Sequence, residues 1–286
     1  AYNVGLLDFK FENNNLTIEE IQAMLNAYHQ KKRFVKLKDN TILEINEDDA
    51  KEINDFLEDF NISIKDINKK IHKPLNYLLK LIEVKDKNLS VDSHVLEIMQ
   101  DIQGFKKSSF LPTDAFLKHL RQYQLEGFKW LKVLSSYGFG GILADDMGLG
   151  KTLEIISFID SDEIEKPSLI VCPMSLVYNW ENECEKWQIR CPVELILGGA
   201  EEREYIINSI ASHKKKLYIT SYDSLRRDVS LYQTHFRFVI ADEAQFIKNQ
   251  FAQKSEAIKA IPSDINFALT GTPIENGLAD LWSIFD

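Results

Sequence analysis

The sequence predicts an α/β protein in which a parallel sheet, with helices on both faces, follows a small α+β domain. Residues 117–286 alternate short, nearly uniform apolar runs with helical stretches, as in a parallel sheet that is covered on both sides. Residues 1–104 instead mix alternating and amphipathic segments. The intervening residues 105–116 contain Ser108, Ser109 and Pro112, which indicates a connector. We therefore expect two domains joined by a linker.

Local signals predict the elements of the first domain. Thr17 and Glu20 have the spacing of a capping box, which predicts that a helix begins there. Residues 33–45 indicate a hairpin that turns at Asp39 and Asn40. A further strand and two helices are expected in residues 4–12, 48–60 and 73–84. This domain carries no evident set of catalytic residues.

Apolar runs predict the strands of the second domain. They occur in residues 140–144, 168–173, 216–221, 236–242 and 265–271. Helical spacing follows the first run in residues 150–160 and the second in residues 176–187. Ligands in such folds bind beyond the carboxyl ends of the strands. The unusual residues of this domain fall at those ends.

The stretch ADDMGLGKT, Ala144 to Thr152, has the context of a phosphate-binding loop, although Asp145 stands where the usual pattern begins with glycine. A strand, a glycine turn and then Lys151 and Thr152 at a helix start allow backbone amides to face an anion. The lysine would supply charge for the outer phosphates and the threonine hydroxyl would bind magnesium. The alternative is a helix start with a solvated lysine.

Two further stretches end strands with polar residues. Asp242 and Glu243 follow an apolar run, where a magnesium held by the first carboxylate and a water polarised by the second would explain both. The alternative is an acidic helix N-terminus. Thr270, Gly271 and Thr272 follow the last run, where their hydroxyls would sense the nucleotide or only cap the next helix.

Composition bounds the class of protein. With 44% hydrophobic and 27% charged residues the chain is expected to fold, and its net charge of −10 excludes a uniformly basic coat for nucleic acid but not local basic clusters. Three cysteines without CxxC spacing argue against a disulfide framework or a zinc site and indicate a reducing cytoplasm. No apolar run approaches the roughly 18 residues of a membrane span. The start at Ala1 instead of methionine suggests a fragment.

Six stretches, taken in order, resemble the helicase-like ATPases of superfamily two, and closely the Swi/Snf family in its bacterial form. They are LRQYQLEGFKWL, GGILADDMGLGKT, SLIVCPMSLVYNWENE, YITSYDSLRRD, FVIADEAQFIKN and FALTGTPIENGLADLWSIFD. The phosphate loop of that family is itself DDMGLGKT, which accounts for Asp145. The resemblance implies an accessory domain followed by the first of two RecA-like lobes, without the second lobe.

The resemblance also implies roles for single residues. Gln124 would hydrogen-bond the adenine edge, because an amide both donates and accepts. ATP and Mg²⁺ would be held by Gly148, Gly150, Lys151 and Thr152, with Asp242 on the metal and Glu243 on the attacking water. Gln245, where many relatives carry histidine, would connect the nucleotide site by hydrogen bonds to Thr270, Gly271 and Thr272, the element expected to couple nucleotide state to nucleic acid.

Four residues are implied to lie near the nucleic-acid backbone: Pro173, Ser175, Ser221 and Tyr222. For this set the alternative is structural, since Ser175 can cap a helix and Tyr222 can be a packed aromatic. Trp180 and Trp187, seven residues apart, are expected in the core instead of stacking on bases.

The implied function is a DNA-dependent ATPase that translocates on double-stranded DNA and remodels or displaces bound proteins. The transition-state arginines would come from the second lobe, so this chain alone is expected to bind Mg-ATP weakly and to turn it over very slowly. The expected partners are duplex DNA and also DNA-bound proteins or RNA polymerase, and no membrane is expected to take part. The protein is expected to be a monomer in the cytoplasm, associated with the nucleoid. The alternatives are a motor dependent on RNA or single strands, and a non-catalytic interaction scaffold.

Overall fold

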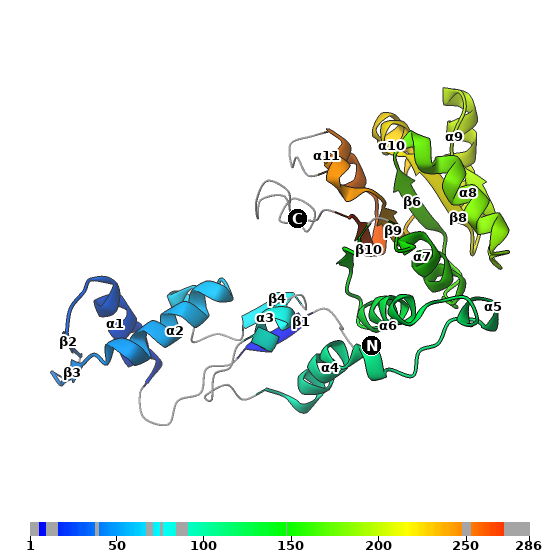
Figure 1. The fold of residues 1–286 in the computed structure, drawn as a ribbon. Helices are drawn as coiled ribbons and strands as arrows, with labels where there is room; N and C mark the ends of the chain where they lie inside the picture. Colours follow the sequence, from blue (N-terminus) through cyan, green and yellow to red (C-terminus); the bar gives the residue numbers. More distant parts are fainter. Residues whose placement is uncertain are drawn as a thin grey trace. The chain divides into compact units, whose positions relative to one another are not determined.

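A computed structural model shows two compact units, Ala1–Met99 and Gln100–Asp286, each described here by itself (Figure 1). The helix α4 (Ser93–Gln103) contains the point of division. The structure describes residues 6–9, 17–37, 40–66, 71–74, 77–83, 91–146, 148–247 and 253–271.

In its described residues, the first unit combines short strands with the helices α1, α2 and α3 and with most of α4. The strands β1 and β4 pair antiparallel in one small sheet, and β2 and β3 pair antiparallel in another. In chain order the elements are β1 (Leu6–Phe9), α1 (Ile18–His29), β2 (Phe34–Lys36), β3 (Ile42–Glu44), α2 (Glu47–Asp59), the 3₁₀ turn η1 (Ile64–Asp66), β4 (Ile71–Pro74) and α3 (Tyr77–Glu83). This is the small α+β module that the sequence predicts.

Local chemistry fixes α1 and the hairpin as predicted. The Thr17 side chain accepts a hydrogen bond from the backbone N–H of Glu20, and the Glu20 carboxylate accepts from the Thr17 N–H at 2.6 Å. This capping box satisfies N–H groups that have no partner inside the helix. In the hairpin, Asn40 takes φ of +70°, a left-handed conformation that asparagine tolerates better than most residues. Asp39, the other predicted turn residue, lies outside the described residues.

The second unit is built on a six-stranded sheet in which every pairing is parallel, as predicted. The strand order is β5-β10-β9-β6-β8-β7. The strands are β5 (Gly141–Leu143), β6 (Ser168–Cys172), β7 (Val193–Leu195), β8 (Leu217–Ser221), β9 (Phe236–Ala241) and β10 (Ser263–Leu269). The edge strand β7 was not among the predicted strands; it has three residues, all only partly buried.

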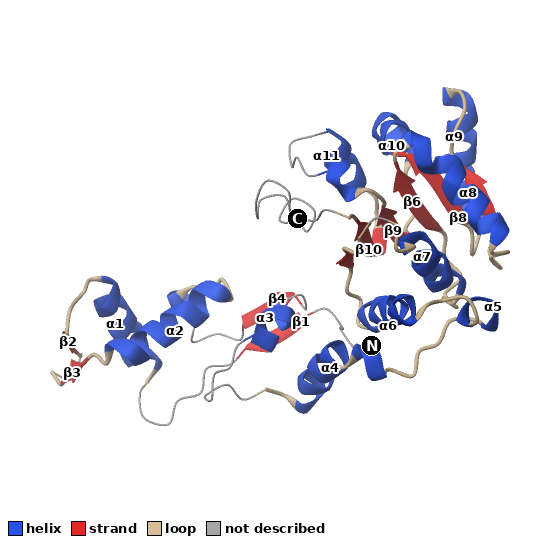
Figure 2. Ribbon diagram, in the orientation of Figure 1, coloured by secondary structure: helices blue, strands red, loops and turns tan. Residues whose placement is uncertain are grey.

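Helices cover both faces of this sheet (Figure 2). On one face α6 (Gln122–Ser136), α7 (Lys151–Asp160) and α8 (Val177–Lys186) pack side by side. Phe158 of α7 contacts this face, with its ring centroid 4.7 Å from that of Phe238 and 5.5 Å from that of Phe267. Burial of both faces explains the nearly uniform apolar strands.

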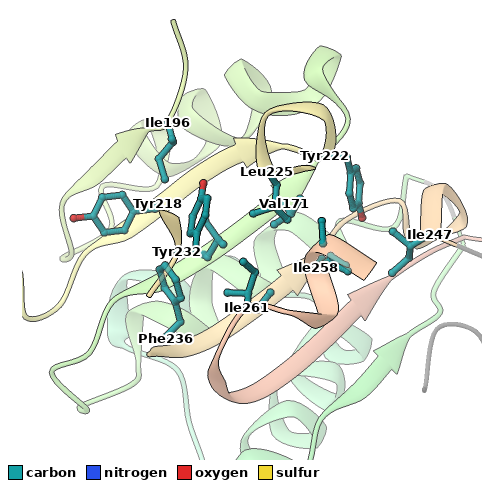
Figure 3. Close-up of a cluster of buried hydrophobic side chains, with 14 of the residues drawn as sticks. Val171, Ile196, Tyr218, Tyr222, Leu225, Tyr232, Phe236, Ile247, Ile258 and Ile261 are labelled. Carbon is teal, nitrogen blue, oxygen red and sulfur yellow. The ribbon is translucent and has the colours of Figure 1, made fainter. Parts of the chain in front are cut away.

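The other face packs against α9 (Ala200–Ser209), α10 (Tyr222–Asp228) and α11 (Gln253–Lys259). Its core joins strand residues such as Val171 and Tyr218 to Leu225 of α10 and Ile258 of α11 (Figure 3). Because side chains alternate along a strand, Val171 lies on this face and Ile170 on the other. The sheet is thereby held between two layers of helices.

The segment predicted as a connector packs within the second unit. It contains the 3₁₀ turn η2 (Phe105–Lys107) and enters the short helix α5 (Asp114–Leu117). Phe116 is buried, and the Thr113 hydroxyl donates to the buried carboxylate of Asp160 at 3.0 Å. Across the described part of the chain, no helix combines the length and apolarity needed to span a membrane.

Candidate functional site

The predicted site residues of four strands meet at one edge of the sheet. All pairings are parallel, so the residues that follow β5, β6, β9 and β10 emerge together. Asp242 follows β9, and its N–H donates to Val171 O of β6 at 2.8 Å. Thr270 follows β10, and its N–H donates to Leu143 O of β5 at 3.2 Å. The sheet register therefore positions the carboxylates, the glycine loop and the threonine turn relative to one another.

The glycine loop follows β5 and ends at the first residue of α7. Gly148 and Gly150 have φ of +83° and +89°, a region that side chains disfavour. A Cβ on Gly148 would meet no atom within 4 Å, so that residue borders open space. A Cβ on Gly150 would lie 2.5 Å from Nε2 of Gln124. One glycine thus gives access to the loop and the other allows close packing beneath it.

Two side chains of α6 hold the loop. Gln124, which is buried, donates from Nε2 to the carbonyl of Leu149 at 3.0 Å, and Tyr123 donates from its hydroxyl to the same carbonyl at 2.9 Å. The Gln124 carbonyl accepts from the Arg121 N–H at 2.9 Å. An amide has two N–H groups and two lone pairs, so Gln124 retains capacity for a further ligand. Its adenine-binding role stays a prediction.

Lys151 and Thr152 are the first two residues of α7. The Lys151 ammonium donates to the Asp145 carbonyl at 2.6 Å and to the Asp146 carbonyl at 3.2 Å, so it folds back over the loop. Amide groups of a first helical turn have no partner within the helix and attract anions. Lys151, Thr152 and the loop amides therefore present positive charge at one place.

Asp242 is a buried residue whose carboxylate accepts two hydrogen bonds and whose backbone carbonyl accepts a third. Its Oδ2 accepts from the indole Nε1 of Trp180 at 2.8 Å, and its Oδ1 accepts from the N–H of Glu243 at 2.9 Å. The backbone carbonyl of Asp242 accepts from the Tyr222 hydroxyl at 2.8 Å. Burial raises the pKa of Asp242, with a contribution from the charge of Glu243, while the Trp180 hydrogen bond and the charge of Lys151 oppose that shift.

Glu243 adopts an uncommon backbone conformation. Its φ is +51°, which costs a residue with a Cβ about 1–2 kcal/mol. Such strain persists only where surrounding structure enforces it, often at functional sites. The conformation turns the chain sharply after β9 and directs it into the 3₁₀ turn η6 (Ala244–Ile247).

Gln245 connects Glu243 to Thr270. Its Nε2 donates to Oε2 of Glu243 at 2.5 Å, and its Oε1 accepts from the Thr270 hydroxyl at 3.1 Å. Thr270 is fully buried. Gly271 is half-buried next to it, and Thr272 lies outside the described residues. Side chains from the ends of two strands are thus joined through one amide.

The four residues predicted near nucleic acid divide into two pairs. Pro173 and Ser175 follow β6, where Pro173 is half-buried and Ser175 is exposed in the 3₁₀ turn η3 (Met174–Leu176). Ser221 and Tyr222 are only 2% exposed. Ser221 caps α10 by accepting from the Ser224 N–H at 3.1 Å, and burial raises the pKa of Tyr222 well above its usual value. The second pair is therefore engaged inside the protein, and its side chains offer no surface for a nucleic acid.

The residues present fit ATP and Mg²⁺. The described part of the chain has no group of three or more His, Cys, Asp or Glu side chains that would hold a metal alone. Magnesium in nucleotide sites, however, needs only one or two carboxylates beside phosphate oxygens and water. Asp242 and the hydroxyl of Thr152 have that chemistry, and the open space above Gly148 adjoins the helix N-terminus.

Sequence reasoning missed three residues of the site. Trp180 was assigned only to the core, and it is 1% exposed, but its N–H also holds Asp242. Tyr123 braces the loop beside Gln124. Glu154 of α7 is fully buried, and burial together with the charge of Asp145 raises its pKa to about 8. Two features of the sequence could have indicated them. Trp180 and Tyr123 each carry a polar group that needs a hydrogen-bond partner when it is buried, and Glu154 lies one helical turn after Lys151.

Comparisons with known families cover nearly the whole chain. Residues 123–286 match the SNF2-related domain, and residues 1–112 match the family described as bacterial SNF2 helicase associated. An uncharacterized ATP-dependent helicase of Mycoplasma pneumoniae is 34% identical over 98% of this chain and 28% of its own length. TATA-binding protein-associated factor MOT1 of Saccharomyces cerevisiae is 37% identical over 66% of this chain and 11% of its own length. The chain thus spans under a third of these relatives.

Solved structures agree with the fold. The SWI2/SNF2 ATPase core of Sulfolobus solfataricus in complex with double-stranded DNA aligns with a TM-score of 0.52 at 39% identity, over 58% of this chain and 35% of that one. The same core domain in a second structure aligns with a TM-score of 0.50 at 34% identity, over 63% of this chain and 36% of that chain. With its RecA-like parallel sheet and a family match over more than half of its length, the chain belongs to the SNF2-related family, in the form that carries the bacterial SNF2 helicase-associated domain.

Proposed function

We propose that this chain is the accessory domain and first RecA-like lobe of an ATPase that uses Mg-ATP to translocate on double-stranded DNA and to remodel or displace bound proteins. The accessory domain would comprise residues 1–104, the connector residues 105–116 and the lobe residues 117–286. The similar SWI2/SNF2 core solved in complex with double-stranded DNA supports duplex as the track.

The observation that carries the proposal is the meeting of a cationic glycine loop with the buried carboxylate of Asp242 and the half-buried Glu243 at one sheet edge. Lys151 is close enough to Asp242 for its charge to lower the pKa of that carboxyl. A site for a metal-bound triphosphate needs this pairing of cation, anion-binding amides and metal ligand. A solvated lysine or an acidic helix start would not bring the two motifs together.

Each residue then has a task in hydrolysis. The loop amides and Lys151 bind phosphate oxygens, and Gln124 reads the adenine edge. Thr152 and Asp242 would hold Mg²⁺, which when bound neutralises charge on the phosphates. Glu243 accepts a proton from, and orients, the attacking water. Its left-handed conformation positions the carboxylate beyond the end of β9.

Gln245 is the proposed connection between hydrolysis and nucleic acid. A change at the water held by Glu243 reaches Thr270 through one amide, because both hydrogen bonds belong to the Gln245 side chain. The exposed Ser175 and the half-buried Pro173 supply contact with the backbone of DNA. Ser221 and Tyr222 support that edge from inside by capping α10 and by holding Asp242.

The parent protein is proposed to act as a monomer in the cytoplasm, associated with the nucleoid, and DNA-bound proteins or RNA polymerase are its proposed targets. A second lobe supplies the arginines that stabilise the transferring phosphate, an effect worth about a thousandfold or more in rate. The 286-residue chain alone is then expected to bind Mg-ATP weakly and to hydrolyse it very slowly.

Phosphate release by the full-length parent protein tests this function. It is measured without nucleic acid and with duplex DNA, single-stranded DNA or RNA of the same length and sequence. We expect strong stimulation by duplex alone. Stimulation by RNA or single-stranded DNA would contradict the duplex assignment and favour a motor that depends on that nucleic acid. If none of the nucleic acids stimulates phosphate release, a non-catalytic interaction scaffold is favoured.

A further inference from the structure

The hairpin of β2 and β3 has one covered face and one open face. Val35 and Leu43 pack against the small core cluster formed by residues of α1, α2 and the end of the hairpin. Side chains alternate along a strand, so Phe34 and Ile42 belong to the opposite face. Both are exposed, Phe34 by 54% and Ile42 by 68%. Two large apolar side chains therefore stand on the uncovered side of a two-stranded ribbon.

Cations surround these two apolar side chains. Lys31, Lys32, Arg33 and Lys36 are exposed, and none of their side chains makes a hydrogen bond or ion pair to another described residue. In the described hairpin residues, 31–37 and 40–45, Glu44 is the one acid, and it lies opposite Phe34 on the open face. In a chain of net charge −10, four cations within six residues form a local positive region at the hairpin.

Helix stabilisation explains only part of the cluster. Lys31 and Lys32 follow the C-terminus of α1, where positive charge is favourable by about 0.3–1 kcal/mol. Arg33 and Lys36 lie beyond that turn, in and beside β2, where the helix exerts little influence. The exposed Phe34 between them has no role in α1. The combination of unpaired cations and apolar side chains on one ribbon face fits a ligand that is both charged and partly apolar.

We propose that this open hairpin face, on which Lys32 and Lys36 accompany Phe34 and Ile42, binds the sugar–phosphate backbone of double-stranded DNA outside the motor lobe. The cations contact phosphates and release counterions, while the apolar side chains contact deoxyribose. A two-stranded ribbon is also narrow enough to follow a groove of the duplex. The inference rests on the proposed function only in taking duplex DNA as the track.

The test is binding of a fluorescently labelled duplex to the full-length parent protein without nucleotide, followed by anisotropy at several salt concentrations. Lys32→Glu and Lys36→Glu are each expected to weaken binding on the order of fivefold and to reduce the salt slope by about 1. The matched control is Lys65→Glu in η1, which is also exposed. Gln22 of α1 donates to Ile64 O beside it, near the end of α1 that is remote from the hairpin. This control should bind like the unmodified protein.

Equal duplex affinity of Lys36→Glu, Lys65→Glu and the unmodified protein would overturn the proposal, as would a loss confined to single-stranded DNA. Should Lys36→Glu melt at a lower temperature, the milder pair Lys32→Gln and Lys36→Gln provides the same comparison with the fold intact. Phosphate release at saturating duplex separates the two proposals, because it tests the motor. Normal stimulation with unchanged affinity would reject the hairpin site and leave the proposed function standing.

Discussion

The indole N–H of Trp180 donates a hydrogen bond of 2.8 Å to Oδ2 of Asp242, and this bond joins α8 to the end of β9. Both residues are buried, so neither polar group has water as a substitute. The bond fixes the orientation of the carboxylate and opposes the rise of its pKa that burial causes. A core residue thereby positions the proposed metal ligand.

Trp180→Phe should separate this role from packing, because phenylalanine keeps an aromatic ring but has no N–H. We expect a loss of about 1–3 kcal/mol in the free energy of unfolding, since Oδ2 of Asp242 becomes unsatisfied. In the full-length protein the Mg²⁺ concentration needed for half-maximal phosphate release should rise. Denaturant titration and a magnesium titration measure the two effects.

Trp187→Phe is the matched control for that variant. Its N–H donates to Glu183 at 2.9 Å on the partly exposed side of the same helix. It should change stability little and leave the magnesium requirement unaltered. If both variants shift the magnesium requirement equally, the Trp180 bond has no particular role in positioning Asp242.

Lys151→Ala should abolish stabilisation by nucleotide and retain the fold. Ligand binding to the folded state raises stability, by about 2.7 kcal/mol at a hundredfold excess over Kd. Since the lone lobe is expected to bind weakly, thermal melting of the chain is measured at millimolar Mg-ATP. Lys186→Ala, an exposed lysine of α8, serves as the control. Equal nucleotide-dependent shifts in the two variants would refute the phosphate assignment.

Glu154 predicts a pH dependence of stability. Its pKa rises from the ordinary value of 4.5 to about 8 in the folded chain, so folding favours the protonated form. The stabilising contribution is full below the unfolded pKa and declines as the pH rises from about 4.5 to 8, by about 1.4 kcal/mol per pH unit. Glu154→Gln removes the titrating group and should gain stability relative to the unmodified chain across that window.

Urea unfolding at pH 5, 6, 7 and 8 measures that difference. Glu185→Gln, on the exposed side of α8, is the control and should follow the unmodified chain at every pH. A constant difference between Glu154→Gln and the unmodified chain over the four pH values would show that Glu154 does not titrate in this range.

Glu243→Gln should retain ATP binding and lose hydrolysis in the full-length protein. Glutamine preserves the shape of the side chain but is not a base, so the attacking water is no longer activated. Fluorescent nucleotide binding and single-turnover phosphate release separate the two steps. Normal hydrolysis by this variant would remove Glu243 from the proposed role, whereas weakened ATP binding would point to a structural effect at the strained turn.

The fold is predictable from the sequence where an element depends on its own residue pattern or on contacts between residues close in the chain. Apolar runs define β6, β8, β9 and β10 because a strand buried on both faces admits few polar residues. The capping box at Thr17 consists of hydrogen bonds between residues three apart, so the start of α1 can be predicted without knowing the tertiary structure. The edge strand β7 escaped notice because partial burial leaves it without that uniform pattern.

The site was predictable where function demands particular residue types and not where only packing brings side chains together. Gly148 and Lys151 are required by any phosphate loop and are evident in the sequence. The Trp180 bond to Asp242 spans 62 residues, and its helical spacing indicates only a buried face. Likewise, burial of Tyr222 beside that carboxylate follows from the packing of α10 on the sheet, which the motif letters do not encode.

The pair Gln245 and Thr270 gives the sharpest test of coupling. Gln245→Ala breaks the link to Glu243 and to Thr270 together, while Thr270→Val breaks only one end of it. Each should leave ATP binding nearly intact and reduce the stimulation of phosphate release by duplex DNA several-fold. Because the two residues share one hydrogen bond, their effects should be less than additive in the double variant, by about 0.5–3 kcal/mol.

Thr220→Val is the control, since Thr220 is also buried and its hydroxyl donates to Ile196 O at 3.1 Å away from this link. It should be additive with Gln245→Ala. Gln245→His, which retains a donor and an acceptor on one ring, should restore much of the stimulation. Strict additivity of Gln245→Ala and Thr270→Val would mean that the nucleotide site and the threonine turn communicate by another route, because a shared hydrogen bond cannot be lost twice.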